Sequence, residues 1–189
     1  MSTGTCYIAL LHHPVYNRRG DVVTTAVTNM DIHDISRAAR SYGVARFYIV
    51  TPIEKQHAFV RRILRHWQRG HGAIANPSRK EAFDIVDIKG TLADVIEELS
   101  AKAERTVHVV ATSAASRGRP TTYEALRMMI GKDGGAYLLV FGTGWGMAGD
   151  VFDRADYLLE PIEGPTGYNH LSVRSAVSIA LDRLFGKRQ

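Results

Sequence analysis

The sequence predicts an α/β domain in which a mostly parallel sheet is covered by helices on both faces. Short apolar segments, typical of strands, alternate along the chain with longer segments whose apolar residues recur every three or four positions. This alternation favours a parallel sheet with crossover helices. The segment 106–111 is rich in valine, as expected of a strand buried on both faces. No repeat or linker divides the 189 residues, so one domain is expected over 1–189.

The first half of the chain is expected to contain three strands and two long helices. In the first helix Ile32 and Ile35 share one face, and Gly43 is suited to end it. In the second helix Phe59 and Ile63 belong to an apolar face of the same spacing. The elements in order are a strand over 7–11, a polar and basic loop over 12–23, a helix over 31–42, a strand over 47–50, a helix over 54–68, a loop over 70–78 and a strand over 83–88.

The second half continues the same alternation. Its elements are a helix that Thr91 caps, a strand over 106–111, a polar loop over 113–120, a helix ending near residue 130, a strand over 136–141, a short strand over 157–159 and a closing helix over 171–185. In sheets of this class, ligands bind beyond the carboxyl ends of the strands. The functional edge is therefore expected to hold His12, His13, Thr51, Thr112, Ser113 and the segments 142–146 and 161–171.

Composition narrows the class of protein. An apolar content of 45% with 23% charged residues is ordinary for a globular chain, and no apolar run is long enough for a membrane span. The single cysteine, Cys6, excludes an internal disulfide and a multi-cysteine metal site, and it is expected to be a buried thiol. His12 and His13 are neighbours in a strand and point opposite ways, so no metal site is expected. The N-terminus shows no secretory signal, which predicts a cytoplasmic protein.

Positive charge is concentrated in one segment. The formal net charge is +5, and residues 55–80 contain seven Lys or Arg residues and no acidic residue. Three of these arginines recur every four residues on the polar face of the second helix, where they favour contact with RNA phosphates. A solvated basic helix has the same pattern, so that alternative stays open. RNA contact is expected for Arg18, Arg19, Arg61, Arg65 and Arg69.

Two glycine-rich loops late in the chain indicate a cofactor site. The strand over 136–141 runs into Gly-Thr-Gly-Trp-Gly (142–146), and a glycine and proline loop over 161–171 runs into the closing helix. Such loops let backbone approach a ligand closely. Residues 144–149 also match Gly-x-Gly-x-x-Gly, so a nicotinamide-dependent oxidoreductase is one hypothesis, and plain turns are another. The late position of the motif and the short, polar segment after it disfavour a nicotinamide site.

Three blocks of sequence carry a resemblance to a known superfamily. They are Thr-Asn-Met-Asp-Ile-His-Asp-Ile-Ser-Arg-Ala-Ala-Arg-Ser-Tyr-Gly-Val (28–44), Leu-Leu-Val-Phe-Gly-Thr-Gly-Trp-Gly (138–146) and His-Leu-Ser-Val-Arg-Ser-Ala-Val-Ser-Ile-Ala (170–180). In this order they resemble the SPOUT superfamily of S-adenosylmethionine (SAM)-dependent RNA methyltransferases, in particular its small bacterial group. The blocks span nearly the whole chain.

The resemblance has structural and functional implications. It implies a C-terminal trefoil knot, a homodimer, SAM bound in the knot, and RNA (tRNA or rRNA) as the methyl acceptor. It assigns cofactor binding to three loops that follow strands. The residues are Ala111, Thr112, Ser113, Phe141, Gly142, Thr143, Gly144, Trp145, Gly146, Ile162, Gly164, Pro165, Tyr168, Asn169, His170, Leu171 and Ser172.

Three residues are candidates for catalysis on the acceptor side. Arg37 lies where many SPOUT enzymes keep an arginine used on the RNA or in catalysis, and Asp31 and Glu163 are candidate acidic groups. An exposed helix arginine and a solvated first-turn aspartate are the alternatives. Ser172 and Arg174 stand where the ribose 2′-O group has Asn and Ser, which leaves base methylation open. A non-catalytic RNA-binding protein on the same fold is the alternative function.

Overall fold

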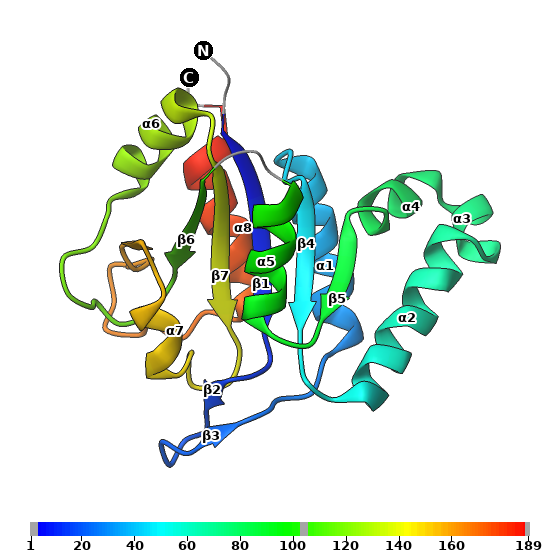
Figure 1. Cartoon of the computed structure of the whole chain (residues 1–189), viewed down its shortest axis with the longest axis horizontal. Coiled ribbons are helices and arrows are strands. Elements are labelled where there is room, and N and C mark those ends of the chain that lie inside the picture. The colour runs from blue at the N-terminus through cyan, green and yellow to red at the C-terminus, as the bar shows by residue number, and fades with distance from the viewer. Residues whose placement is uncertain (1–3, 103–105, 188–189) are drawn as a thin grey trace.

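The computed structural model describes residues 4–102 and 106–187, and a six-stranded, all-parallel sheet forms its centre (Figure 1). The ends of the expected domain, 1–3 and 188–189, lie outside these residues. In spatial order the strands are β5 (Val86–Lys89), β4 (Arg46–Val50), β1 (Thr5–Leu11), β7 (Ala136–Gly142), β6 (Val107–Ala111) and β8 (Tyr157–Leu158). The predicted parallel α/β class is confirmed.

Helices cover both faces of the sheet. One face carries α1 (Asn29–Ser41), α2 (Glu54–Gln68), α4 (Pro77–Phe83), α6 (Tyr123–Asp133) and α8 (Val173–Phe185), and the other carries α5 (Leu92–Lys102) and α7 (Gly149–Asp153). In Figure 1 α5 lies in front of the sheet, with α1 and α8 behind it. Alternate residues of the central strands point to opposite faces of the sheet. Ile8 and Leu10 belong to the core that contains residues of α1 and α8, and Ala9 and Leu11 belong to the core that contains residues of α5 and α7.

The expected loop over 70–78 is wrong. It contains α3 (His71–Ala75) and the start of α4. The side chain of Asn76 accepts a hydrogen bond from the Arg79 N–H and so caps α4, and Pro77 occupies the first turn, where its missing N–H costs nothing. The two helices are only five and seven residues long, too short for an apolar period to be recognised in the sequence.

Other boundaries shift because of local capping. The expected strand over 83–88 begins at Val86, since the buried Phe83 ends α4. Side chains of Thr28 and Ser172 accept N–H bonds at the starts of α1 and α8, which therefore begin at 29 and 173. The expected loop over 12–23 contains a small antiparallel hairpin of β2 (Val15–Tyr16) and β3 (Val22–Val23).

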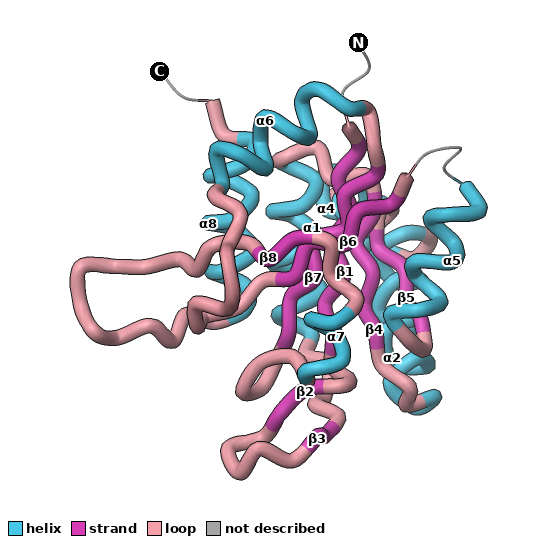
Figure 2. The backbone as a smooth tube through the Cα atoms, turned by 60° about the vertical axis from the view of Figure 1, so that its left-hand side comes forward, coloured by secondary structure: helices cyan, strands magenta, loops and turns pink. Residues whose placement is uncertain are grey.

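The carboxyl ends of the central strands meet at one edge of the sheet. Leu11 at the end of β1 lies opposite Val50 of β4 and Gly142 of β7, and Ala111 of β6 lies opposite Val140. Figure 2 shows the β2–β3 hairpin and α7 grouped at this end. The loops expected to be functional therefore gather at the predicted edge.

Candidate functional site

A cavity of about 660 Å³ opens at the carboxyl edge of the sheet. Residues from four separate segments line it, lying within 25–31, 112–123, 141–152 and 160–176. They follow or precede β3, β6, β7 and β8, so the topology of the sheet brings them together. A concave site of this volume is typical of small-molecule and cofactor sites.

Backbone rather than side chains forms much of one wall. Gly142 ends β7, and a Cβ there would lie 2.5 Å from Cγ and 2.9 Å from N of Met147. Gly144 has φ +61, and a Cβ on it would lie 2.8 Å from the Tyr16 carbonyl. The Trp145 N–H donates to that carbonyl at 2.9 Å, and the Tyr16 N–H donates to the Gly146 carbonyl at 2.8 Å. The β2–β3 hairpin thus fixes the glycine loop, and any side chain added at Gly142 or Gly144 would displace it.

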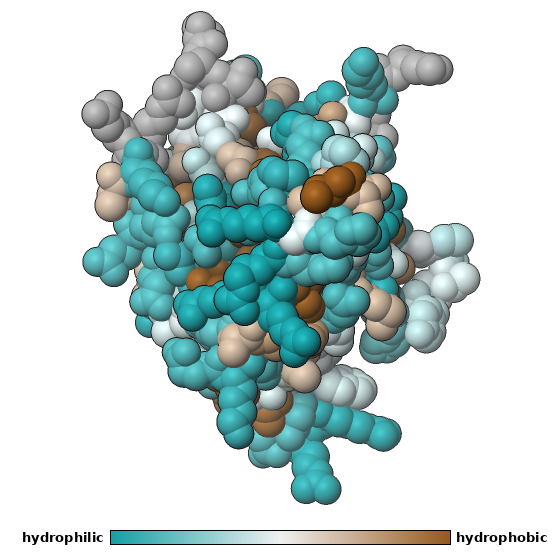
Figure 3. All heavy atoms as spheres, turned by 90° about the vertical axis from the view of Figure 1, so that its right-hand side faces the viewer, coloured by the Kyte–Doolittle hydropathy of each residue, from teal (hydrophilic) through white to brown (hydrophobic). Residues whose placement is uncertain are grey.

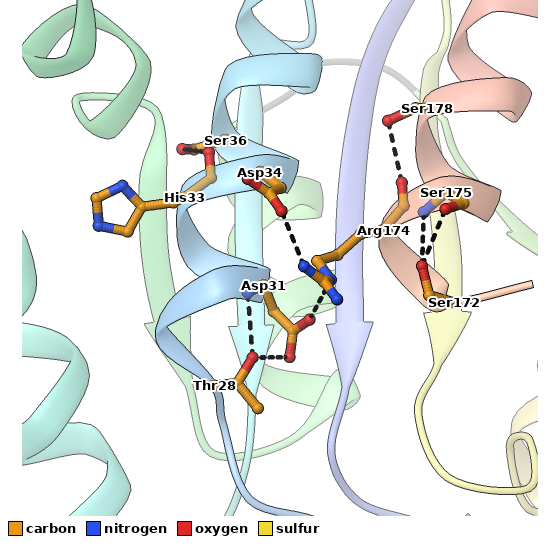
Figure 4. Close-up of polar contacts among 9 residues, drawn as sticks. All are labelled: Thr28, Asp31, His33, Asp34, Ser36, Ser172, Arg174, Ser175 and Ser178. Atoms are coloured by element: carbon orange, nitrogen blue, oxygen red, sulfur yellow. Dashed lines mark hydrogen bonds and ion pairs between the residues drawn. The ribbon is translucent and has the colours of Figure 1, made fainter.

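A nearly buried carboxylate also lines the cavity. Asp31, in the first turn of α1, is 8% exposed and contributes to the cavity lining. Its backbone N–H donates to the Thr28 hydroxyl at 3.1 Å, and that hydroxyl donates to the Asp31 carboxylate at 2.6 Å. Arg174 Nε of α8 lies 3.5 Å from the other carboxylate oxygen (Figure 4). The carboxylate is therefore held in one orientation, with lone pairs left for a ligand.

Residues 5–186 match the protein family described as SAM-dependent RNA methyltransferase. The chain belongs to this family. The resemblance seen in the sequence is confirmed, as are the enzyme class, the SAM cofactor and the RNA substrate.

Individual proteins are similar to this chain in sequence or in fold. The methyltransferase is 42% identical over 183 residues to an uncharacterized protein of Aquifex aeolicus, covering 97% of this chain and 89% of that protein. It is also 42% identical over 180 residues to a tRNA (guanine-N(1)-)-methyltransferase of Oleidesulfovibrio alaskensis; the match covers 95% of this chain but only 42% of that protein. The fold is similar to that of the SpoU methyltransferase AviRb from Streptomyces viridochromogenes, determined in complex with AdoMet, with a TM-score of 0.61 and 14% identity over 98% of this chain and 58% of that one.

The lining of the cavity fits an adenosine cofactor. A Cβ at Gly142 would meet Met147 and one at Gly144 would meet the Tyr16 carbonyl, so the loop keeps bare backbone at these positions, which suits a flat ligand held by backbone. Phe141, Ile162 and Leu171 supply apolar surface, as an adenine ring requires. Glu160 places a carboxylate in the lining, which suits a positively charged sulfonium.

Most of the predicted cofactor residues line this cavity. Those that do are Thr112, Ser113, Phe141, Gly142, Thr143, Gly144, Trp145, Gly146, Ile162, Asn169, His170, Leu171 and Ser172. Ala111 is buried in β6, while Gly164, Pro165 and Tyr168 are exposed on the loop after β8, away from the lining. Asn169 fixes part of that loop, because its side-chain amide donates to the Ala114 carbonyl at 2.7 Å.

The three candidate catalytic residues are not brought together. Asp31 lines the cavity, whereas Arg37 and Glu163 are exposed and do not contribute to its lining. Sequence reasoning missed Thr28 and Arg174. The signal for Thr28 is its position directly before the first helical turn with an aspartate three residues on, which is a capping pattern. The sequence gives no sign that Arg174 pairs with Asp31 and Asp34, because α1 and α8 lie far apart along the chain.

A buried histidine ties the cavity wall to the glycine loop. His12 is fully buried at the end of β1, and its Nδ1 lies 3.1 Å from the Thr25 hydroxyl. Thr25 in turn bonds to the Thr143 hydroxyl, which donates to the Leu11 carbonyl at 3.0 Å. Burial lowers the pKa of His12 to about 4, and the charge of Asp31 opposes part of this shift. The imidazole is therefore neutral at pH 7, and its contact with Thr25 links the end of β1 to the glycine loop.

This histidine predicts a loss of stability in mild acid. The unfolded chain binds a proton on His12 near pH 6.5, while the folded chain resists it down to about pH 4, so the free energy of unfolding falls as pH drops through this window. Between about pH 7.5 and about pH 5 the expected loss from His12 is about 2 kcal/mol. Urea unfolding of the wild type and His12→Asn at both pH values measures it. The wild type should lose more stability than the variant between the two pH values. His33, whose pKa burial also lowers, is present in both proteins, so its contribution cancels. Equal losses would therefore contradict the assignment of the pH dependence to His12.

The residues expected to contact RNA lie on the surface. Arg61 and Arg65 are exposed on α2, Arg69 is exposed directly after it, and Arg18 and Arg19 are exposed in the β2–β3 hairpin. Figure 3 shows that the face formed by α2, α3 and α4 is mainly hydrophilic. None of the described helices has the length and apolar character needed to cross a membrane. Among the described residues there is also no cluster of three potential metal ligands of the His, Cys, Asp and Glu types.

Proposed function

We propose that this methyltransferase modifies a base of structured RNA, with SAM in the cavity and Asp31 as the group that accepts the proton of the methylated atom. The observation that carries the proposal is the nearly buried Asp31 carboxylate in the lining of a cavity that the glycine loop over 142–146 also lines. tRNA is the first acceptor to test, because a relative is named a tRNA (guanine-N(1)-)-methyltransferase.

The reaction is an in-line displacement. When bound, SAM supplies an electrophilic methyl group: the acceptor lone pair forms the new bond to carbon, the C–S bond breaks, and its electron pair stays on sulfur in S-adenosylhomocysteine. The chain's own task is alignment and proton removal. The backbone of the glycine loop orients the cofactor, Thr28 holds the Asp31 carboxylate, and Asp31 takes the acceptor proton. Exposed Arg37 and Glu163 are assigned to the side that meets RNA.

The assembly is also part of the proposal. We infer a single domain with a trefoil knot formed by the segments after β7, acting as a cytoplasmic homodimer on tRNA or rRNA. The support is the family and the position of the 160–172 loop and α8 at the cavity. Light scattering during size-exclusion chromatography tests the dimer, for which we expect twice the mass of the 20.9 kDa chain. A monomer at micromolar concentration would contradict it.

The function is tested by methyl transfer. Labelled SAM is incubated with the protein and with tRNA or rRNA from a strain that lacks the gene, and nucleoside mass spectrometry identifies the product. We expect transfer to one RNA class at one nucleotide. Calorimetry with SAM and with NADH separates the alternatives. SAM binding without transfer would favour a non-catalytic RNA-binding protein, and NADH binding without SAM binding would favour an oxidoreductase.

The RNA surface yields a separate prediction. Gln56 in the first turn of α2 accepts the Val27 N–H at 2.7 Å, which connects α2 to the cavity-lining segment around Thr25 and Thr28. RNA lying along α2 would therefore reach the cavity. Arg61→Ala combined with Arg65→Ala should weaken RNA binding and make the slope of log K against log salt shallower by about 1.5. Each of the two lost phosphate contacts contributes about 0.7 to 0.9 to that slope.

A matched control removes the same charge elsewhere. Arg127 and Lys132 are exposed on α6, at the other end of the molecule from α2 (Figure 1). Changing both to alanine should leave the salt slope unchanged, and adding Arg69→Ala to the α2 variant should reduce it further. Equal slopes for the α2 and α6 variants, measured by filter binding from about 50 to 200 mM salt, would show that α2 is only a solvated helix.

A further inference from the structure

One arginine joins two helices, α1 and α8, that border the cavity. Arg174, in the first turn of α8, reaches across to α1 and lies between two carboxylates (Figure 4). Its Nε is 3.5 Å from Asp31 Oδ1, and its Nη1 donates to Asp34 Oδ2 at 3.0 Å. Asp31 and Asp34 are three residues apart on one helix, so they present neighbouring oxygens to a single guanidinium.

The two ion pairs differ in their surroundings. The Asp31 side chain is 11% exposed, that of Asp34 is 50% exposed, and that of Arg174 is 31% exposed. The pair with Asp34 is screened by water and contributes little energy, but it fixes the plane of the guanidinium. The pair with Asp31 lies in a less polar environment, where loss of the cation would leave a nearly buried charge without its counter-ion. Arginine suits both tasks because its donors are fixed in a plane; lysine offers a single point charge.

The carboxylate of Asp31 is thus held from two sides. Thr28 donates to Oδ2 and Arg174 lies against Oδ1, so neither oxygen can rotate away from the cavity wall without losing a partner. Arg174 does not line the cavity, whereas its neighbours Ser172 and Val173 do. It therefore lies beside Asp31 outside the cavity lining, and its contact with the lining is through Asp31.

We propose that Arg174 is the positioning residue for Asp31, fixing its orientation so that it can accept the proton of the methylated base. This inference rests on the proposed function, in which Asp31 is the proton acceptor. It accounts for an arginine at a position where the ribose 2′-O group has serine. Asp34 serves as the second tether that keeps the guanidinium in place.

The test separates positioning from folding and from cofactor binding. Arg174→Ala is assayed for methyl transfer to tRNA from a strain lacking the gene, for SAM affinity by calorimetry without RNA, and for thermal unfolding. We expect kcat to fall by at least 30-fold while the Kd for SAM stays within threefold, because the arginine touches Asp31 and not the cavity lining. Arg174→Lys should recover part of the lost kcat, and millimolar guanidinium added to Arg174→Ala should recover more, since it can occupy the vacated position.

A matched control and the contrary outcomes complete the experiment. Arg40 also lies on α1 and pairs with Glu81, away from the cavity, so Arg40→Ala removes an ion pair of the same helix and should keep kcat within twofold. The proposal is overturned if Arg174→Ala keeps kcat within threefold of wild type. It is also overturned if lower activity is matched by weaker SAM binding, or if neither lysine nor guanidinium restores activity. If Arg174→Ala does not fold, kcat and the Kd for SAM are compared with the wild type for Arg174→Lys and Arg174→Gln instead. A wild type that binds no SAM would instead refute the proposed function.

Discussion

Gly142→Val is expected to abolish SAM binding and leave a folded protein. The glycine ends β7, and even a Cβ there would come within 2.5 Å of the Met147 side chain and 2.9 Å of its backbone nitrogen. Because the hairpin holds the loop through Tyr16, the strain cannot be relieved without moving the wall that faces the cofactor. We expect the Kd for SAM to rise by at least about 100-fold, equivalent to about 2.7 kcal/mol. Calorimetry measures the affinity, and circular dichroism with light scattering checks fold and assembly.

Two further variants make this result specific. Gly142→Ala adds the Cβ alone and should weaken binding less than valine, since the Met147 side chain can move partly aside. Gly131 lies on α6, and a Cβ on it would meet nothing within 4 Å, so Gly131→Val should bind SAM like the wild type. Unchanged affinity in Gly142→Val would show that the glycine loop is not a wall of the SAM pocket.

The fold was predictable from the sequence wherever the apolar period is long or the strand is wholly buried. The burial of β7 from 136 to 141 and the apolar face of α1 follow directly from residue order. The two short helices α3 and α4 were not predicted, because five and seven residues give too few turns to show a period. The sequence Asn76-Pro77 contained the only local signal, a cap followed by a proline suited to a first turn.

Two parts of the cavity lining also differ in how far the sequence predicts them. The glycine loop could be predicted because its chemistry is local: glycines directly after a strand imply close backbone approach. The surroundings of Asp31 depend on contacts between residues that are far apart in the sequence. Arg174 and Asp34 are 140 positions apart, and only the packing of α1 against α8 brings them together. The same holds for the chain of bonds from His12 through Thr25 to Thr143.

Asp31→Asn is expected to eliminate most methyl transfer while SAM still binds. The amide keeps the size of the carboxylate but cannot take up a proton, so the step that depends on a general base is lost. We expect kcat to fall by about 10²- to 10⁴-fold, the usual contribution of such a group. The Kd for SAM should stay within about threefold, a change of less than about 0.7 kcal/mol. Steady-state kinetics with tRNA and calorimetry with SAM measure the two quantities separately.

The chain offers a control with a similar local structure. At the start of α5 the Asp94 N–H donates to the Thr91 hydroxyl at 3.1 Å, as the Asp31 N–H does to that of Thr28. The Asp94 carboxylate accepts the Thr91 backbone N–H at 2.8 Å, where that of Asp31 accepts the Thr28 hydroxyl. Asp94 is exposed and does not line the cavity, so Asp94→Asn reports only the cost of weakening a helix start. If both variants lose activity only in proportion to their lower stability, Asp31 is a capping residue. A loss confined to Asp31→Asn, with SAM affinity retained, can arise only from the chemistry at the acceptor.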